Sequence, residues 1–396
     1  MKIGIIKEGK KPMDRRVPLS PKQCMELKQL YPQLSLVVQP SDIRCFTDQD
    51  YLQEGVKLQK DLSDCDLIMG IKEVPLDFLI PNKKFLFFSH TIKKQPYNKN
   101  LLKEILQKKI DLIDYEVLKN VNGERIIGFG RYAGIVGGYN AFLTHGLKTK
   151  KYDLKPAYLC VDKKEMENEL EKVKIDNLKI ILTGNGRVSK GAEEILKKLN
   201  IKKVSKEDFL DQSFSSSVYT RLTVVDYYET SGSKNYSKED IYKNPSQYIS
   251  CFSKYLTNAD MLITGHFYDS KAPFLFTKND IISNKKLKVV ADISCDINGP
   301  IACTIRPSKI TSPIYGYNPM TFKEDDFLKD GVIAVMAVDN LPCELPKDAS
   351  IYFGKELIKN VIPNFLNDKD DIIKKATITQ RGSLTEIFKY LDDYVS

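Results

Sequence analysis

The stretch Lys179-Ile-Ile-Leu-Thr-Gly-Asn-Gly-Arg-Val-Ser-Lys-Gly191 runs directly into the helical pattern Ala192–Leu199. A short apolar strand, a turn with glycines two residues apart and an amphipathic helix form the unit that cradles a dinucleotide pyrophosphate. Glycine lets the backbone approach the phosphates, and the free N–H groups at the helix start favour an anion. Ser189 stands where the fingerprint has its third glycine, and Gly191 follows two residues later. The turn predicts a nucleotide site that contains Gly184, Asn185, Gly186, Arg187 and Val188.

About half of the chain precedes this stretch, and its pattern predicts a second domain. Short apolar strands alternate there with helical segments, which is typical of a mostly parallel sheet covered on both faces. The strand pattern Lys2–Ile6, the helix pattern Pro21–Leu30 and the strand pattern Leu36–Gln39 are the first three elements. The chain becomes helical again over Lys347–Leu366 and Ile387–Tyr394, and we expect these helices to pack on the first domain.

These patterns predict an α/β protein with two Rossmann-like doubly wound domains and a cleft between them. Residues 1–140 together with 345–396 would form the substrate domain, and residues 141–344 the dinucleotide-binding domain. Within the second domain, Ser205–Asn258 is rich in Tyr, Ser, Asn and Lys and predicts a long excursion with short helices of its own.

The composition excludes several classes of protein. Hydrophobic residues make up 42% of the 396 residues, yet no apolar run approaches the ~20 residues of a membrane-spanning helix. The first eight residues resemble a strand rather than a secretory signal, so we expect a cytoplasmic location. Eight cysteines without a CxxC pair indicate buried reduced thiols rather than a metal site. The net charge of +9 comes from scattered lysines, which favours small-molecule partners over nucleic acid.

Polar residues follow four strands of the predicted first sheet. In open parallel sheets, ligands bind just outside the carboxyl ends of the strands, so these residues are candidates for a shared site. In chain order they are Arg16, Lys72, His90 with Lys93, and Asp114 with Glu116.

Two members of this group are candidates for acid–base chemistry. Lys72 follows a buried strand, where desolvation and nearby cations such as Arg16 and Lys93 would lower its proton affinity and make it a base near neutral pH. His90 lies in a polar cluster and is the candidate acid, whereas His145 and His266 have structural surroundings. A cationic pocket that faces a nicotinamide predicts hydride transfer to or from a substrate with carboxylates.

The choice of cofactor depends on the end of the second strand of the nucleotide domain, Lys202–Lys206. NAD sites commonly place an acid there, whereas a hydroxyl among cations suits a 2′-phosphate. Ser205 lies between Lys203 and Lys206, which favours NADP; Glu207 and Asp208 follow directly and leave NAD open.

With these residues assembled, the chain resembles the lysine-forming saccharopine dehydrogenases and the lysine–2-oxoglutarate reductases, which are similar in fold to alanine dehydrogenase and the transhydrogenase nucleotide-binding subunit. The resemblance rests on stretches in order along nearly the whole chain: Arg15–Pro21, Phe87–Lys93, Leu112–Glu116, Phe129–Gly134, Thr183–Gly191, Ala291–Asp296 and Ala337–Pro342. The excursion is more similar to the reductases, for which the family implies NADPH, than to the compact fungal enzymes, for which it implies NAD.

The resemblance implies a role for each matching position. Lys72 would be the general base, His90 the general acid, and Glu116 would modulate their charge. Four residues would hold the carboxylates and stem of saccharopine: Arg16, Lys93, Gln95 and Phe129. Five residues would flank the nicotinamide end of the cofactor: Arg125, Val338, Asp339, Asn340 and Leu341.

The implied activity is the reversible NAD(P)-dependent reductive condensation of L-lysine with 2-oxoglutarate to saccharopine. An alanine dehydrogenase-like deamination of a small amino acid stays open as an alternative, and so does a catalytically idle nucleotide-binding regulator. The sequence gives neither the oligomeric state nor the physiological direction.

Overall fold

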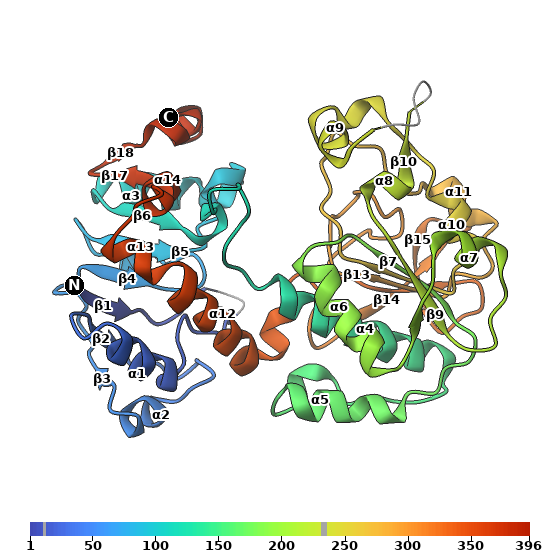
Figure 1. The fold of residues 1–396 in the computed structure, drawn as a ribbon, viewed down its shortest axis with the longest axis horizontal. Coiled ribbons are helices and arrows are strands. Elements are labelled where there is room, and N and C mark those ends of the chain that lie inside the picture. Colours follow the sequence, from blue (N-terminus) through green and yellow to red (C-terminus); the bar gives the residue numbers. More distant parts are fainter. Residues whose placement is uncertain (11–12, 231–235) are drawn as a thin grey trace. The chain divides into compact units, whose positions relative to one another are not determined.

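The computed structural model describes residues 1–10, 13–230 and 236–396, which divide into two compact units (Figure 1). The first unit consists of Met1–Phe129 and Pro346–Ser396, and the second of Gly130–Leu345. The sequence placed a boundary at residue 140, but this position lies inside helix α4 (Gly130–Thr149). Because α4 is continuously buried from Gly134 to Gly146, it packs as one element, and the division falls before its first residue.

The first unit is built on an eight-stranded sheet. In sheet order its strands are β18 (Ser383–Leu384), β17 (Thr377–Gln380), β6 (Asp111–Asp114), β5 (Lys84–Phe87), β4 (Leu67–Met69), β1 (Lys2–Ile5), β2 (Ser35–Val38) and β3 (Lys57–Leu58). The six strands from β6 to β3 are parallel, and the β17–β18 hairpin adds antiparallel strands beside β6. The chain order of the strands reverses between β1 and β4, which is where doubly wound sheets bind ligands.

Both faces of this sheet are buried, as the alternation of strands and helices predicted. Along β5, Phe85 and Phe87 belong to one hydrophobic core and Leu86 belongs to the other. The covering helices are α1 (Pro21–Leu30), α2 (Asp48–Gln53), α3 (Lys99–Gln107), α12 (Pro346–Asn360), α13 (Ile362–Leu366), α14 (Ile372–Ala376) and α15 (Asp392–Val395). The residues after Leu345 thus return to the first unit.

Two details of this return differ from the sequence prediction. The single helix expected over Lys347–Leu366 is divided between α12 and α13, because Pro363 lacks the N–H that would continue the ladder of hydrogen bonds. The β17–β18 hairpin was not predicted at all. Its strands are short, and pairing with the edge of β6 rather than their own pattern makes them strands.

The second unit contains another eight-stranded sheet. In sheet order its strands are β15 (Lys323–Asp325), β14 (Ile314–Asn318), β16 (Ile333–Met336), β13 (Val289–Asp292), β12 (Met261–Thr264), β7 (Lys179–Thr183), β9 (Val218–Leu222) and β8 (Lys202–Lys203). The strands from β16 to β8 are parallel, and β14 and β15 are antiparallel. A separate antiparallel pair is formed by β10 (Tyr228–Glu229) and β11 (Ile249–Ser250).

On the side of β7 opposite to β12, the neighbouring strand is β9. Strand β8, which follows β7 in the sequence, pairs with β9 instead. Strand β9 lies inside Ser205–Asn258, which the sequence analysis treated as an excursion without a sheet strand. Val218, Tyr219, Thr220 and Leu222 are buried, and β8 is a two-residue exposed edge strand. The remaining helices of this unit are α5 (Lys163–Glu169), α6 (Arg187–Lys198), α7 (Lys206–Asp211), α8 (Val224–Tyr227), α9 (Lys238–Lys243), α10 (Ser253–Leu256) and α11 (Lys278–Ile282).

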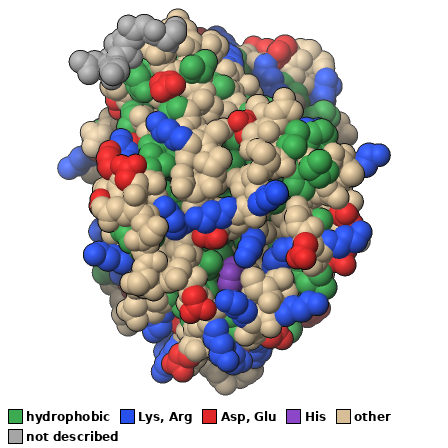
Figure 2. Space-filling model, turned by 90° about the vertical axis from the view of Figure 1, so that its right-hand side faces the viewer, with side chains coloured by type: hydrophobic (Ala, Val, Ile, Leu, Met, Phe, Trp, Pro, Cys, Tyr) green, Lys and Arg blue, Asp and Glu red, His purple; other side chains and the backbone are tan. Residues whose placement is uncertain are grey.

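The surface agrees with the interpretation that the net charge comes from lysines scattered over the solvent-exposed surface. On the face in Figure 2, lysine and arginine side chains are interspersed with aspartate and glutamate. Among the helices of the described residues, none is long and apolar enough to cross a membrane.

Candidate active site

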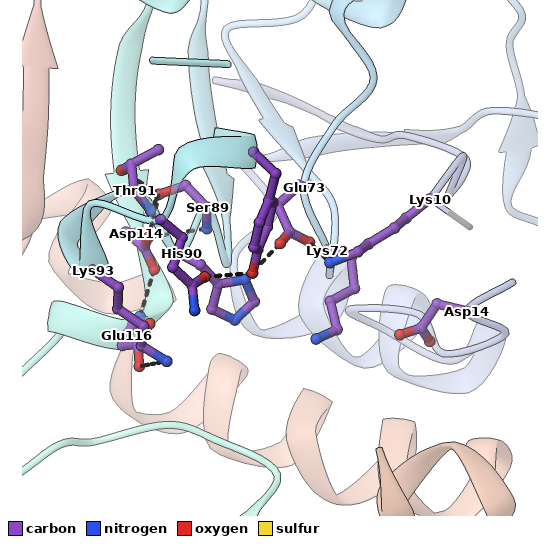
Figure 3. A network of polar contacts seen from close by, with 12 residues as sticks. Lys10, Asp14, Lys72, Glu73, Ser89, His90, Thr91, Lys93, Asp114 and Glu116 are labelled. Atoms are coloured by element: carbon purple, nitrogen blue, oxygen red, sulfur yellow. Dashed lines mark hydrogen bonds and ion pairs between the residues drawn. The ribbon is translucent and has the colours of Figure 1, made fainter. Parts of the chain in front are cut away.

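The carboxyl ends of the strands in the first unit carry a network of charged side chains (Figure 3). Glu8, Asp14 and Arg16 follow β1; Lys72 and Glu73 follow β4; His90 and Lys93 follow β5; Asp114 and Glu116 lie at the end of β6 and just after it. Because these strands are parallel neighbours, their ends meet at one edge of the sheet. Arg16, Lys72, His90, Lys93 and Glu116, which the sequence proposed for one site, are therefore brought to the same edge.

His90 is held by a glutamate that the sequence analysis did not single out. The His90 Nδ1 atom lies 2.8 Å from Glu73 Oε1, and Lys10 Nζ lies 2.6 Å from Glu73 Oε2. Burial alone would raise the pKa of Glu73, but the hydrogen bonds from His90 and Lys10 outweigh it and lower the pKa to about 2. An ionised Glu73 accepts a hydrogen bond from the Nδ1–H group, so Nε2 is the ring atom left for proton transfer. The only signal for Glu73 in the sequence was its position next to Lys72.

Lys72 lies between the Glu73–His90 pair and Asp14 (Figure 3). Within the described residues, its ammonium group has no partner at ion-pair distance. Burial lowers the pKa of Lys72, and the charges of Arg16 and Lys10 lower it further. The sequence predicted this direction but expected Lys93 as the second cation. Lys10 takes that place, because Lys93 is bound to a different carboxylate.

Arg16 is almost fully buried and forms a forked pair with Asp14. Its Nε and Nη2 atoms donate to the two Asp14 oxygens at 3.0 and 2.5 Å, and its guanidinium lies 4.2 Å from the centre of the Phe129 ring. Burial would raise the pKa of Asp14, but the charge and hydrogen bonds of Arg16 lower it to about 2. Phe129 in turn stacks on Phe353 at 4.5 Å, which fixes the surface against which Arg16 rests.

Glu8 lies beneath the turn that carries Lys72. Its two carboxyl oxygens accept hydrogen bonds from the backbone N–H groups of Ile71 and Lys72, at 2.6 and 3.0 Å. Burial and the neighbouring Asp14 raise the pKa of Glu8 to about 8. Glu8 therefore fixes the backbone of this turn, and its carboxyl group is mostly protonated at neutral pH. The sequence analysis did not select it.

Glu116 collects two of the predicted site residues. Lys93 Nζ and Arg125 Nη2 lie 3.2 and 3.1 Å from Glu116 Oε1, and Arg125 Nε donates to the Glu116 backbone carbonyl at 3.0 Å. Burial would raise the pKa of Glu116, but the charges of Lys93 and Arg125 outweigh it and lower the pKa. Arg125, expected at the nicotinamide end of a cofactor, is thus bound to a carboxylate of the first unit.

The loop that carries His90 is anchored where it leaves β5. The backbone N–H and hydroxyl of Ser89 donate to Asp114 Oδ2 at 2.9 and 2.5 Å, and burial raises the pKa of Asp114. Further along the loop, Gln95 is half-buried, and its side-chain oxygen accepts a hydrogen bond from the Tyr97 hydroxyl.

The network as a whole alternates in charge. Asp14 faces Arg16, Glu73 faces Lys10 and His90, and Glu116 faces Lys93 and Arg125. The sequence predicted a cluster of cations here, and it overlooked most of the acids. Arg16 is the buried cation of the network that is paired, as a buried charge requires, whereas Lys93 and Arg125 are partly exposed. Among the described residues of this network, Lys72 is the cation without an ion-pair partner.

The glycine turn of the second unit has the form that the sequence predicted. Gly184 has φ +88°, and a Cβ atom there would lie 2.5 Å from the Gly265 carbonyl oxygen, so only glycine fits. Ser189, at the position of the missing third glycine, closes the turn by donating from its hydroxyl to the Gly184 carbonyl at 2.9 Å. Helix α6 begins at Arg187, directly after this turn. The later Gly191 has another role, because a Cβ atom there would lie 2.1 Å from the Arg131 carbonyl oxygen of α4.

A cavity of about 680 Å³ lies beside this turn. Its lining comes from the ends of β7, β9 and β12 and from α6, α8 and α9: Gly184, Asn185, Gly186, Arg187, Val188, Thr223, Val224, Val225, Tyr227, Lys238, Tyr242, Gly265, His266 and Phe267. The five residues predicted from the glycine motif are all present. Val338, Asp339, Asn340 and Leu341 follow β16 and are not part of this lining.

The space and the lining of this cavity fit a dinucleotide. The start of α6 offers backbone N–H groups to a pyrophosphate, and the added Cβ at Gly186 would meet open space. The lining contains two cationic side chains, Arg187 and Lys238, and no aspartate or glutamate among the described residues. His266 also borders the cavity, with its Nδ1 atom 2.6 Å from the Thr183 hydroxyl.

Ser205, which the sequence analysis assigned to the cofactor, is not among the residues that line this cavity. It caps helix α7, accepting a hydrogen bond from the Asp208 N–H at 2.9 Å. Because β9 and not β8 neighbours β7, the residue that follows the neighbouring strand is Thr223. Thr223 donates from its N–H and hydroxyl to Asp226 Oδ2, both at 2.7 Å, and Lys206 Nζ lies 2.6 Å from Asp226 Oδ1. The nearest acid after β9 is thus already paired.

Comparison with known proteins agrees with this architecture. The chain matches the family descriptions "Alanine dehydrogenase/PNT, N-terminal domain" over residues 4–136 and "Alanine dehydrogenase/PNT, C-terminal domain" over residues 221–386. The fold matches a solved L-alanine dehydrogenase with a TM-score of 0.66 at 17% identity, over 100% of both chains.

Two curated relatives are similar to this chain in sequence. The alpha-aminoadipic semialdehyde synthase of Arabidopsis thaliana is 31% identical over 98% of this chain and 41% of its own length. This chain therefore spans less than half of that relative. The saccharopine dehydrogenase [NAD(+), L-lysine-forming] of Neurospora crassa is 24% identical over 84% of this chain and 82% of its own length.

Proposed function

The chain belongs to the alanine dehydrogenase/PNT family of oxidoreductases, and from this premise we propose that it joins L-lysine to 2-oxoglutarate and reduces the product to saccharopine, reversibly. The observation that carries the proposal is the arrangement of Lys72 beside the Glu73–His90 pair at one sheet edge. A base of lowered proton affinity next to an oriented imidazole matches what the reaction requires.

The condensation moves two protons from the lysine nitrogen to the carbonyl oxygen, which then leaves as water. The first must leave the ε-ammonium before the nitrogen can attack the carbonyl carbon; the second leaves the nitrogen after the attack, and the oxygen takes up two protons in all. Lys72 accepts the first because its own ammonium form is destabilised by burial and by Arg16. His90 delivers a proton to the oxygen from Nε2, because Glu73 holds Nδ1. Each step of this kind contributes about 10²–10⁴-fold to the rate. The nicotinamide cofactor, when bound, supplies or takes up the hydride.

The paired cations have a use in this proposal. Saccharopine carries three carboxylates, and Arg16, Lys93 and Arg125 each hold a protein carboxylate instead. A substrate carboxylate would share or replace these partners, so binding exchanges one ion pair for another rather than filling an empty cationic pocket. Gln95 and Phe129 would flank the stem of the substrate at the same edge.

We propose NADP rather than NAD as the cofactor. The cavity beside the glycine turn is lined by Arg187 and Lys238 and, among the described residues, by no acid that could accept ribose hydroxyls; Asp226 is paired with Thr223 and Lys206. A 2′-phosphate suits such a lining. The preference for NADP is therefore supported by Lys238 and by the paired Asp226 after β9, rather than by Ser205.

One assay tests the activity. The purified chain is mixed with NADPH and either lysine plus 2-oxoglutarate or pyruvate plus ammonia, and NADPH oxidation and product mass are measured. Oxidation with lysine plus 2-oxoglutarate and formation of saccharopine support the proposal. Oxidation only with pyruvate plus ammonia would establish an alanine dehydrogenase instead, and a chain that binds NADPH but oxidises it with neither pair would be a regulator.

The cofactor assignment is tested by binding. Isothermal titration should give a lower Kd for NADPH than for NADH, and Lys238→Met should raise the Kd for NADPH by roughly 10-fold while leaving NADH unchanged. Lys243→Met, on the same helix but outside the cavity lining, is the matched control. Equal affinities for the two cofactors would rule out the NADP preference.

A further inference from the structure

The loop between β5 and α3 carries three of the proposed site residues, His90, Lys93 and Gln95. It follows a strained path, because His90 and Lys94 both have positive φ angles, 53° and 51°, in the left-handed region that favours glycine. A non-glycine residue holds this conformation only where its surroundings fix it. Ser89 provides one anchor, through its two hydrogen bonds to Asp114.

The second anchor comes from nearly 300 residues further along the chain. The segment Glu386–Val395, formed by the 3-10 helix η9 (Glu386–Leu391) and α15, contacts the loop at two consecutive residues. The Tyr394 hydroxyl donates to the Gln95 backbone carbonyl, and Lys94 Nζ lies 2.6 and 2.8 Å from the two oxygens of Asp393. Lys94 also lies over the Tyr390 ring, 5.6 Å from its centre.

This segment is itself firmly seated. Phe388, Leu391 and Tyr394 are buried in the same hydrophobic core as Leu102 of α3, and Ile92 of the loop packs against that core. The contacts with the loop therefore start from a rigid base. The two adjacent lysines of the loop have different partners, because Lys94 pairs with Asp393 of the segment and Lys93 pairs with Glu116.

We propose that Glu386–Val395 is a positioning clamp for the substrate loop, with Tyr394 and Asp393 as its positioning residues. The proposal rests on the function proposed above, which assigns Lys93 and Gln95 to the substrate carboxylates. By fixing Lys94 and the Gln95 carbonyl, the clamp sets the direction in which Lys93 and the Gln95 side chain point. It touches neither Lys72 nor the Glu73–His90 pair, so it acts on substrate binding rather than on proton transfer.

The test compares two variants of the full chain with wild type. Tyr394→Phe combined with Asp393→Asn removes the hydroxyl that donates to Gln95 and the charge that pairs with Lys94, and it keeps the size of each side chain. Glu386→Gln is the matched control, because Glu386 lies on the same segment but, among the described residues, its ion pair is with Lys389 and not with the loop. Steady-state kinetics give KM and kcat for 2-oxoglutarate, and hydrogen–deuterium exchange measures the backbone amides of residues 89–98.

The double variant should raise the KM for 2-oxoglutarate by about 5–20-fold, with kcat and the KM for NADPH within threefold of wild type. The amides of residues 89–98 should exchange at least several-fold faster, while Glu386→Gln stays at wild-type values. An unchanged KM, a fall confined to kcat, or equal effects in Glu386→Gln would each overturn the clamp. A wild-type chain that does not use 2-oxoglutarate would end the proposed function, and exchange alone would then decide whether the segment orders the loop.

Discussion

The sites of the two units are built in opposite ways. At the strand ends of the first unit, charged side chains form the site, and almost every charge is paired with one of opposite sign. At the glycine turn of the second unit, backbone groups and the open space beside them form the site, and the cavity is lined mostly by glycine, small and apolar residues.

The difference teaches how each site tolerates burial. Pairing tunes proton affinity in such a network, as the low pKa of Glu73 illustrates, and burial beside other cations lowers the pKa of Lys72. A site for a large anion instead needs unobstructed backbone N–H groups, which side chains would cover. We therefore expect the first site to be sensitive to changes of charge and the second to changes of volume.

The largest effect should come from removing the unpaired lysine. Lys72→Met should reduce turnover with lysine and 2-oxoglutarate by about 10²–10⁴-fold, because the proton acceptor is lost. The Kd for NADPH, measured by titration calorimetry, should not change. Lys57→Met, on the exposed edge strand β3, serves as the control. Turnover of Lys72→Met within a few-fold of wild type would exclude Lys72 as the base.

A single methyl group should disturb the second site more than a change of charge. Gly184→Ala forces a Cβ against the Gly265 carbonyl at a positive φ, so the free energy of unfolding should fall by about 1–3 kcal/mol and NADPH binding should weaken at least 10-fold. Gly186→Ala is the control for stability, because its Cβ meets nothing within 4 Å. Denaturant unfolding measures the stability of both variants. Equal free energies of unfolding for Gly184→Ala and Gly186→Ala would contradict the assigned role of Gly184.

Neutralising Glu73, the partner of His90, should reduce turnover less than removing Lys72 does. Glu73→Gln preserves the shape of the side chain but removes the charge that holds His90 Nδ1, and turnover should fall by up to about 10²-fold. Steady-state kinetics check this against Glu26→Gln, an exposed position on α1. If Glu73→Gln and Glu26→Gln behaved alike, the orientation of His90 would not depend on this pair.

The smallest effect concerns the pH dependence of stability. The pKa of Glu8 is raised from its usual value near 4.5 to about 8, so the folded protein holds a proton that the unfolded chain releases between these pH values. Stability from this group is complete below pH 4.5 and is lost as pH rises toward 8. Glu8→Gln should therefore show a shallower decline than wild type in denaturant unfolding from pH 5 to 8. Parallel curves would contradict the raised pKa.

The sequence predicted the fold class well because local patterns carried it. Glycine spacing before an amphipathic helix identified the nucleotide turn, and alternating strands and helices identified the sheet of the first unit. Patterns failed where pairing with a neighbour decides the structure. The β17–β18 hairpin and strand β9 are strands because of the edges they join, and β9 lies between β7 and the strand that precedes Ser205.

The same distinction applies to the candidate active site. Lys72 and His90 were identifiable, because each follows a buried strand at the edge where ligands bind. Glu8, Lys10 and Glu73 were not selected, because a lone charged residue in a lysine-rich sequence is usually a solvated one. Their meaning comes from which atoms they face, and those atoms belong to other strands.

The order of residues by itself determined most of the strands and helices and which polar groups follow those strands, since both depend on short-range periodicity. Only the tertiary structure decided which charge meets which: that Lys10 and His90 share Glu73, that Asp226 is occupied, and that Tyr394 holds the loop of Gln95. Such contacts join residues far apart in the chain, and the free energy of pairing a buried charge depends on its neighbours in space.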